Sequence, residues 1–234
     1  VLGLLFGYDD GQSTFNLSFW ITNLIITILL CFISITIYDV GHKIVAKKLG
    51  CRSTFEIWGV KRLSLRTSGY IHSSKRSVPF GVIIPLLLLF LTKGVVKFAA
   101  VSTIENTAST ARRLSREFSK LSEFDEARIA LAGPYIALVI ALLAKAVSSS
   151  MPLLNALTTI NIHLALFNIL PIPTLDGIKV YFGSPLLFSF SFVMILGVFI
   201  FINFISPLAA ILLSITAAII AFFVHYNVGF VKSK

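Results

Sequence analysis

The sequence predicts an all-α polytopic membrane protein with about five or six transmembrane helices, a re-entrant or hairpin segment and a small β-rich loop. Of its 234 residues, 56% are hydrophobic and only 13% are charged. Soluble domains carry roughly a quarter of charged residues, so this composition does not supply a water-exposed surface. Apolar runs of about 20 residues, the length that crosses a bilayer, recur along the chain. They occupy most of it, which predicts one membrane domain over residues 1–234.

The first long apolar run, residues 17–49, predicts a transmembrane helix that ends at a basic face. No Lys or Arg precedes it, whereas Lys43, Lys47 and Lys48 lie at its end and more basic residues follow. Because positively charged loops stay on the cytoplasmic side, we expect the N-terminus outside and the basic loops in the cytoplasm. The net charge of +10 gathers beside apolar runs, so we expect anionic lipid at the basic face and no nucleic-acid partner.

The middle of the chain is less regular. Short alternating stretches in residues 54–77 predict a strand-like basic loop. Residues 78–101 are apolar but interrupted by Pro85 and Gly94, and a single crossing would place the arginines of residues 102–126 outside. We therefore expect a re-entrant or hairpin segment over 78–101, followed by an interfacial segment over 102–126.

The last part of the chain consists of two helical hairpins. Residues 127–177 predict a helix pair that ends in a Pro-rich stretch, and residues 184–226 predict a C-terminal hairpin. In this topology nearly every basic residue is cytoplasmic, with Lys145 as the exception.

Three ionisable side chains mark a candidate site. Asp39, His42 and Asp176 lie in or at the end of apolar spans, where a charge costs roughly 3 kcal/mol or more. Two inward-running helices bring them to a similar depth, and Asp39 and His42 share one helix face. Two carboxylates and an imidazole form a plausible site for a zinc-like cation. The alternative is that Asp39 pairs with Lys43 and His42 contacts lipid headgroups.

Three segments resemble the motifs of the site-2 protease family. Residues 38–42, Tyr-Asp-Val-Gly-His, resemble the family's His-Glu-x-Gly-His. Residues 168–177 match its Asn-x-x-Pro-x-x-x-(Leu/Met)-Asp-Gly motif, and residues 127–134 resemble its Arg-x-x-x-Ala-Gly-Pro segment. The matches follow the family's order. The resemblance implies the fold of an intramembrane zinc metalloprotease that cleaves transmembrane helices.

The resemblance also assigns roles. It makes His42 and Asp176 metal ligands, and it places Asn168 and Pro171 in the substrate-binding motif. The chain departs from the family at two positions, because Tyr38 replaces the first zinc-binding histidine and Asp39 replaces the general-base glutamate. A tyrosine oxygen binds metal only as phenolate, and aspartate is one methylene shorter than glutamate.

In view of these two departures, we consider three functions in the following order. The first is a proteolytically inactive family member that binds transmembrane helices or supports a membrane complex, with zinc weakened or absent. The second is an active or weakly active protease, in which Asp39 binds metal directly or His163 supplies a third nitrogen instead of a polar interhelical contact. The third is a transporter or channel that uses the intramembrane carboxylates.

Overall fold

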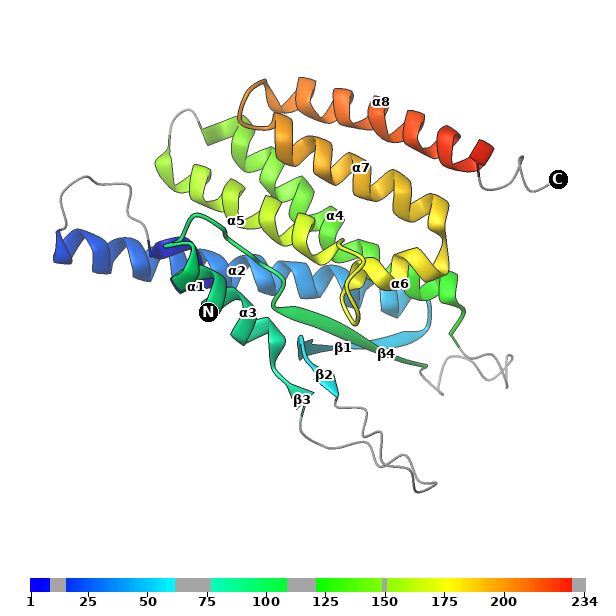
Figure 1. The fold of residues 1–234 in the computed structure, drawn as a ribbon, viewed down its shortest axis with the longest axis horizontal. Helices are drawn as coiled ribbons and strands as arrows, with labels where there is room; N and C mark the ends of the chain where they lie inside the picture. Colours follow the sequence, from blue (N-terminus) through cyan, green and yellow to red (C-terminus); the bar gives the residue numbers. More distant parts are fainter. Residues whose placement is uncertain (9–15, 62–76, 109–120, 149–150, 229–234) are drawn as a thin grey trace.

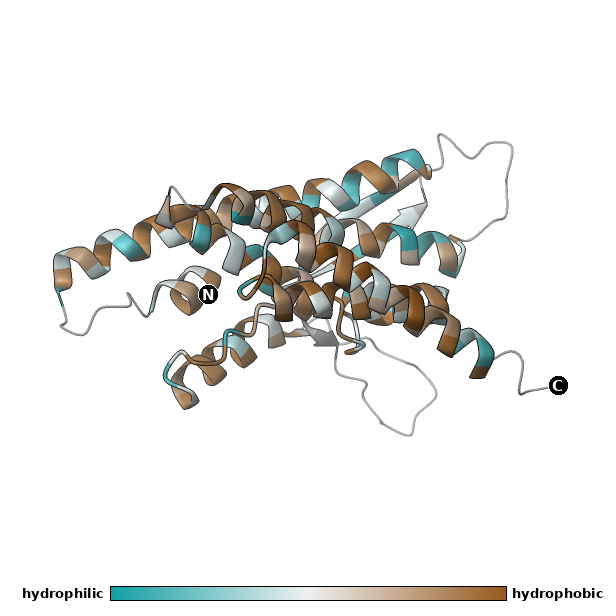
Figure 2. Ribbon diagram, turned by 90° about the horizontal axis from the view of Figure 1, so that it is seen from above, coloured by the Kyte–Doolittle hydropathy of each residue, from teal (hydrophilic) through white to brown (hydrophobic). Residues whose placement is uncertain are grey.

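The computed structural model describes residues 1–8, 16–61, 77–108, 121–148 and 151–228, and these are mostly helical (Figure 1). Three of the helices are long and apolar enough to cross a membrane: α2 (Leu17–Lys48), α4 (Glu123–Val147) and α8 (Pro207–Tyr226). Three shorter apolar helices accompany them: α3 (Phe80–Leu91), α5 (Pro152–Asn168) and α7 (Pro185–Phe201). Hydrophobic residues predominate along all of these helices (Figure 2).

Two short helices were not predicted from the sequence. Helix α1 (Leu2–Gly7) packs against α2, and α6 (Asp176–Gly183) follows the Pro-rich stretch. The boundaries of the longer helices follow the apolar runs closely, and local signals set their starts. Asn16 accepts hydrogen bonds from the first turn of α2, while serines and prolines begin α7 and α8.

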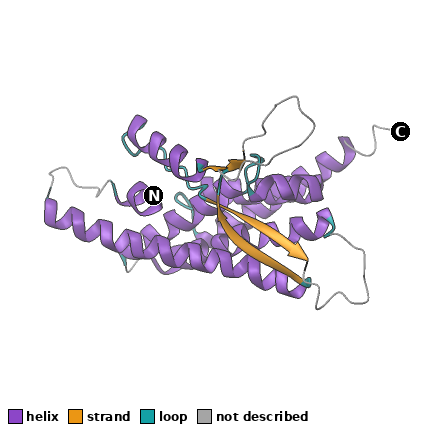
Figure 3. Cartoon of the chain, turned by 90° about the horizontal axis from the view of Figure 1, so that it is seen from below, coloured by secondary structure: helices purple, strands orange, loops and turns teal. Residues whose placement is uncertain are grey.

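Two small antiparallel ladders are present, and the longer one starts where α2 ends and runs back alongside that helix (Figure 1 and Figure 3). Strand β1 (Cys51–Ile57) pairs with β4 (Ser102–Ala108), with Cys51 opposite Ala108. Strand β2 (Val60–Lys61) pairs with β3 (Ser77–Val78). Strand β4 corrects one expectation, because its residues were assigned to an interfacial segment over 102–126. Residues 109–120 of that segment lie outside the described residues, and α4 already begins at Glu123.

The segment over 78–101 reverses direction. Helix α3 ends at a turn in which Lys93 and Gly94 adopt positive φ, and the chain then returns in an extended form. Both ends of the segment meet Trp58, whose backbone accepts from Gly81 N at 2.9 Å and donates to Val101 O at 2.8 Å. Residues 78–101 therefore begin and end beside Trp58, as the two arms of a hairpin do.

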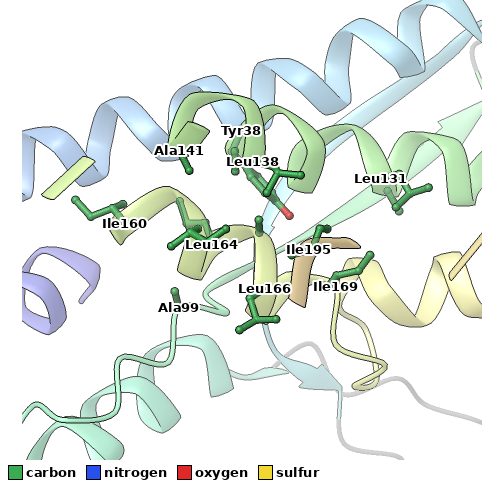
Figure 4. Close-up of a cluster of buried hydrophobic side chains, with 14 of the residues drawn as sticks. Tyr38, Ala99, Leu131, Leu138, Ala141, Ile160, Leu164, Leu166, Ile169 and Ile195 are labelled. Atoms are coloured by element: carbon green, nitrogen blue, oxygen red, sulfur yellow. The ribbon is translucent and has the colours of Figure 1, made fainter. Parts of the chain in front are cut away.

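Helix α4 lies at the centre of the fold and contacts α2, α5 and α6. Its contact surface is built largely from fully buried alanines, which allow the neighbouring helices to approach closely. Figure 4 shows Tyr38 of α2 among the buried aliphatic side chains of α4 and α5, including Leu138 and Leu164. The core thus continues up to the residues that the sequence singled out.

Candidate functional site

Tyr38, His42 and Asp176 meet in the interior. Tyr38 Oη donates a hydrogen bond to Asp176 Oδ2 at 2.6 Å, and His42 Nε2 lies 3.3 Å from the same oxygen. All three side chains are buried, with exposed fractions of 2%, 0% and 1%. Tyr38 and His42 are four residues apart on α2 and therefore share one face, while Asp176 is the first residue of α6.

His42 is oriented by a second contact on the other side of its ring. Nδ1 lies 2.7 Å from the carbonyl oxygen of Ile129 on α4, and because a carbonyl only accepts, Nδ1 carries the proton. Nε2 makes no hydrogen bond with the described residues, and Asp176 Oδ1 makes none either. The contact between Nε2 and Asp176 is therefore an ion pair when the ring is protonated, without hydrogen-bond alignment.

Three glycines from the three motif segments allow this close packing. A Cβ on Gly133 of α4 would lie 2.6 Å from Tyr38 Cζ and 2.7 Å from His42 Cε1. A Cβ on Gly41 would lie 2.5 Å from the side chain of Ile136, and one on Gly177 would overlap the backbone of Ile169. At Gly133 and Gly177 the neighbours are rings and backbone, which cannot move aside, whereas the end of the Ile136 side chain near Gly41 can shift.

Asp39 lies outside the cluster, which corrects the expected convergence of two carboxylates and one histidine. Its Oδ2 accepts from Lys43 Nζ at 2.5 Å, one turn further along α2. This is the alternative pairing that the sequence left open for Asp39. The other half of that alternative is wrong, because His42 is fully buried against Ile129 and Asp176 and cannot contact headgroups.

The second motif holds its own residues in place. Asn168 is fully buried at the end of α5, donates from Nδ2 to Leu164 O at 2.9 Å, and leaves Oδ1 without a partner among the described residues. Pro171 is exposed in the loop that follows. His163 lies further up α5, where it contacts Phe6, Phe167 and Phe199, and no contact joins it to Asp176.

The loop before Asp176 is clamped by residues that the sequence analysis missed. Trp58 Nε1 donates to Pro173 O at 3.1 Å, and Thr103 of β4 donates to Thr174 O. Thr174 has φ of 70°, a left-handed conformation that is rare for a β-branched residue. The only sequence signal for these contacts was a tryptophan just after a strand, which is a position where a large side chain is often buried. Contacts from Trp58 and Thr103 therefore add to the loop's own hydrogen bonds, such as that from Ile172 N to Leu170 O at 2.8 Å.

Lys179 adds a cation beside the cluster. It lies on α6 one turn after Asp176, and its ammonium donates to Ile104 O of β4. Burial lowers the pKa of Lys179 below its ordinary value, and nearby carboxylates oppose this effect, those of Asp176, Glu126, Glu105 and Glu56. Lys179 therefore links α6 to β4 at the edge of the site.

The converging residues do not fit a catalytic zinc ion. Such an ion needs three protein ligands and an open position for water. Within the described parts of the chain no group of three His, Cys, Asp or Glu side chains could hold a metal ion. Tyr38, at the position to which the resemblance would give a third ligand, donates its hydroxyl to Asp176 Oδ2. Asp39, at the position to which the resemblance would give a general base, pairs with Lys43.

The chain was also compared with protein-family models, curated proteins and solved structures. None of these comparisons found a match.

Proposed function

We propose that this chain is a membrane-embedded protein of site-2-protease-like build that has lost proteolytic activity and binds transmembrane helices of partner proteins. In this proposal the former catalytic cluster serves as a structural link between α2, α4 and α6. Zinc binding is weak or absent.

The hydrogen bond from Tyr38 to Asp176 carries the proposal. At 2.6 Å it joins side chains 138 residues apart and uses a carboxylate oxygen that a metal would need. A buried carboxylate needs compensation for the water it has lost. Here the compensation comes from protein groups, namely the Tyr38 hydroxyl and, when it is protonated, the His42 ring.

The helix surfaces support binding of partner helices. Only 22% of the apolar window of α2 and 17% of that of α8 is buried within the chain. On α2 the large side chains of Ile25, Leu29 and Phe32 are 54%, 57% and 69% exposed. In a bilayer such faces contact either lipid or another helix.

Charge supports the orientation of the chain. Lys43, Lys47 and Lys48 lie at the end of α2 that carries the cluster, so we place this end on the cytoplasmic side beside anionic lipid. The segment from α3 through the turn lies beside α1, since α3 contacts α1 and Lys97 Nζ lies over the ring of Phe6 at 5.8 Å. Lys93 and Lys97 thus join Lys145 as basic residues away from the basic face.

One observation favours the alternative, a weakly active zinc protease. His42 Nε2 and Asp176 Oδ1 are buried and make no hydrogen bond with the described residues, which is how two ligands of a cation would look. This reading needs a third ligand and a base that the described residues do not bring to the cluster.

Metal analysis and a restored variant separate the two functions. The purified protein should hold well under one zinc per chain, and His42→Ala should not change that content. A double variant, Tyr38→His with Asp39→Glu, should bind zinc and cut a transmembrane-helix substrate. If the unaltered protein cuts the same substrate as fast as the double variant, the proposal of an inactive protein is wrong.

Partner binding has its own test. A photoreactive residue at Phe32, on the exposed face of α2, should cross-link to partner membrane proteins in native membranes. The matched control is Cys31, which is buried, with an exposed fraction of 3%. Equal cross-linking to lipid alone from both positions would contradict helix binding by α2.

A further inference from the structure

A cavity of about 340 Å³ lies between the middle of α5 and the C-terminal end of α7, and none of its lining residues belongs to the Asp176 cluster. Its lining combines apolar side chains with a few polar ones, and His163 is among them. The volume lies at the lower end of the range of small-molecule sites. The exposed side chains of Ile200 and Phe204, at 46% and 82%, stand at its mouth.

His163 is held in one tautomer. Its Nδ1 lies 2.7 Å from Thr159 O, one turn earlier on α5, and the carbonyl can only accept, so Nδ1 carries the proton. Three phenyl rings enclose the imidazole, those of Phe6, Phe167 and Phe199, with centroids 5.5, 6.0 and 5.2 Å away. An ionised imidazole would be costly in this apolar enclosure.

A neutral ring with its proton on Nδ1 leaves a lone pair on Nε2. Within the described residues Nε2 has no hydrogen-bond partner, although the ring lines the cavity. A ligand that suits this cavity would be mostly apolar and would carry one hydrogen-bond donor for the Nε2 lone pair. Among the other polar groups of the lining, the hydroxyls of Thr158 and Thr159 donate to backbone carbonyls, and Asn203 Oδ1 accepts from Lys145 Nζ at 3.5 Å.

We propose that this cavity binds a membrane-soluble hydroxyl compound, a phenol or an alcohol, whose O–H donates to His163 Nε2 while its apolar body lies against Phe199 and Phe204. The site is independent of the function proposed above, since it shares no residue with the Tyr38, His42 and Asp176 cluster.

The first test uses ligands that differ only in the hydroxyl. The full chain in lipid nanodiscs should bind decylhydroquinone saturably, and the dimethyl ether of that probe should bind about tenfold more weakly. 1-Decanol separates the two sources. Affinity equal to that of decylhydroquinone assigns the site to alcohols in general, and much weaker binding assigns it to phenols. Equal affinity for the hydroquinone and its ether, or mere partitioning without saturation, overturns the proposal.

The second test changes the site. His163→Phe keeps the ring and removes the acceptor, so it should weaken decylhydroquinone binding about tenfold, while His225→Phe on α8 should leave it unchanged. Ile200→Trp, which fills the mouth from an exposed position, should also weaken binding. Its matched control is Ile220→Trp, at a position on α8 that is 64% exposed. Unchanged binding in both His163→Phe and Ile200→Trp would refute the site.

Discussion

His42 and His163 lie on apolar helices and are held in the same way, yet they face different surroundings. In each ring Nδ1 lies 2.7 Å from a backbone carbonyl, that of Ile129 on a neighbouring helix for His42 and that of Thr159 on its own helix for His163. Nε2 of His42 then faces the carboxylate of Asp176 at 3.3 Å, whereas His163 lines an apolar cavity among phenyl rings. The two positions therefore differ in the group that faces Nε2, and that group, not the histidine alone, defines each site.

The difference predicts unequal losses of stability when each histidine is replaced by phenylalanine. His42→Phe leaves the Asp176 carboxylate buried without the imidazole, which should lower the free energy of unfolding by about 3 kcal/mol. His163→Phe keeps the ring packing and loses one hydrogen bond within its helix, so we expect a loss of about 0.5 to 1 kcal/mol. Unfolding by SDS in mixed micelles measures both, and equal losses would contradict the comparison.

Adding a methyl group next to His42 should destabilise the Tyr38, His42 and Asp176 cluster without affecting the surroundings of His163. Gly133→Ala places a methyl group against Tyr38 and His42, with 2.6 Å to Tyr38 Cζ, and should cost about 2 kcal/mol. The control is Gly7→Ala, whose nearest neighbour is the flexible end of Leu24 at 3.0 Å. The same SDS titration should find a change of only a few tenths of a kcal/mol for the control. A tolerated alanine at 133 would mean that α4 does not press on the cluster.

The hydrogen bond of Tyr38 can be isolated with a double-mutant cycle. Tyr38→Phe should lower the free energy of unfolding by about 1 kcal/mol, near the upper range for interhelical bonds in membranes. In an Asp176→Leu background the same change should cost nothing, because the acceptor is gone. Tyr135→Phe removes a 2.7 Å bond to Ser191 between two neutral hydroxyls and should cost about half as much. Equal costs of Tyr38→Phe in both backgrounds would show that the bond contributes nothing.

The smallest effect is expected at Asp39. Lys43→Met removes a surface partner that is 53% exposed, so the loss should be under about 0.5 kcal/mol and should fade at high salt. Unfolding curves at two salt concentrations provide the measurement. A loss that exceeds about 1 kcal/mol and ignores salt would place Asp39 inside the buried network.

The sequence predicted the long helices well because their signal is local. Apolar runs that end at serine, proline or basic residues set the limits of α2, α4, α5, α7 and α8 within a few residues. Strand β4 could not be found in this way, since its partner β1 lies about 50 residues earlier and the pairing is the only reason for the strand. Helix α1 was missed because it is only six residues long and owes its burial to α2.

The sequence predicted two of the three clustered residues, His42 and Asp176, but it placed Asp39 beside them where the structure has Tyr38. Two faces of α2 could have presented residues to Asp176, one with Tyr38 and His42 and one with Asp39 and His42, since spacings of three and four are both close on a helix. The packing of α4 decides between them, because Gly133 and Ile129 lie against Tyr38 and His42. The position of α4 depends in turn on its other neighbours. The motif on α2 alone therefore cannot predict which of its faces meets Asp176.

The 138 residues between Tyr38 and Asp176 also cause a delay between the synthesis of the two hydrogen-bond partners. At roughly 5 to 20 residues per second, about 7 to 28 seconds pass between the synthesis of α2 and that of its partner. During this interval α2 carries a phenol and an imidazole with no Asp176 to meet them, so the young helix is polar at a position that later becomes part of the core. A nascent chain that stops before α6 keeps both side chains without their Asp176 partner.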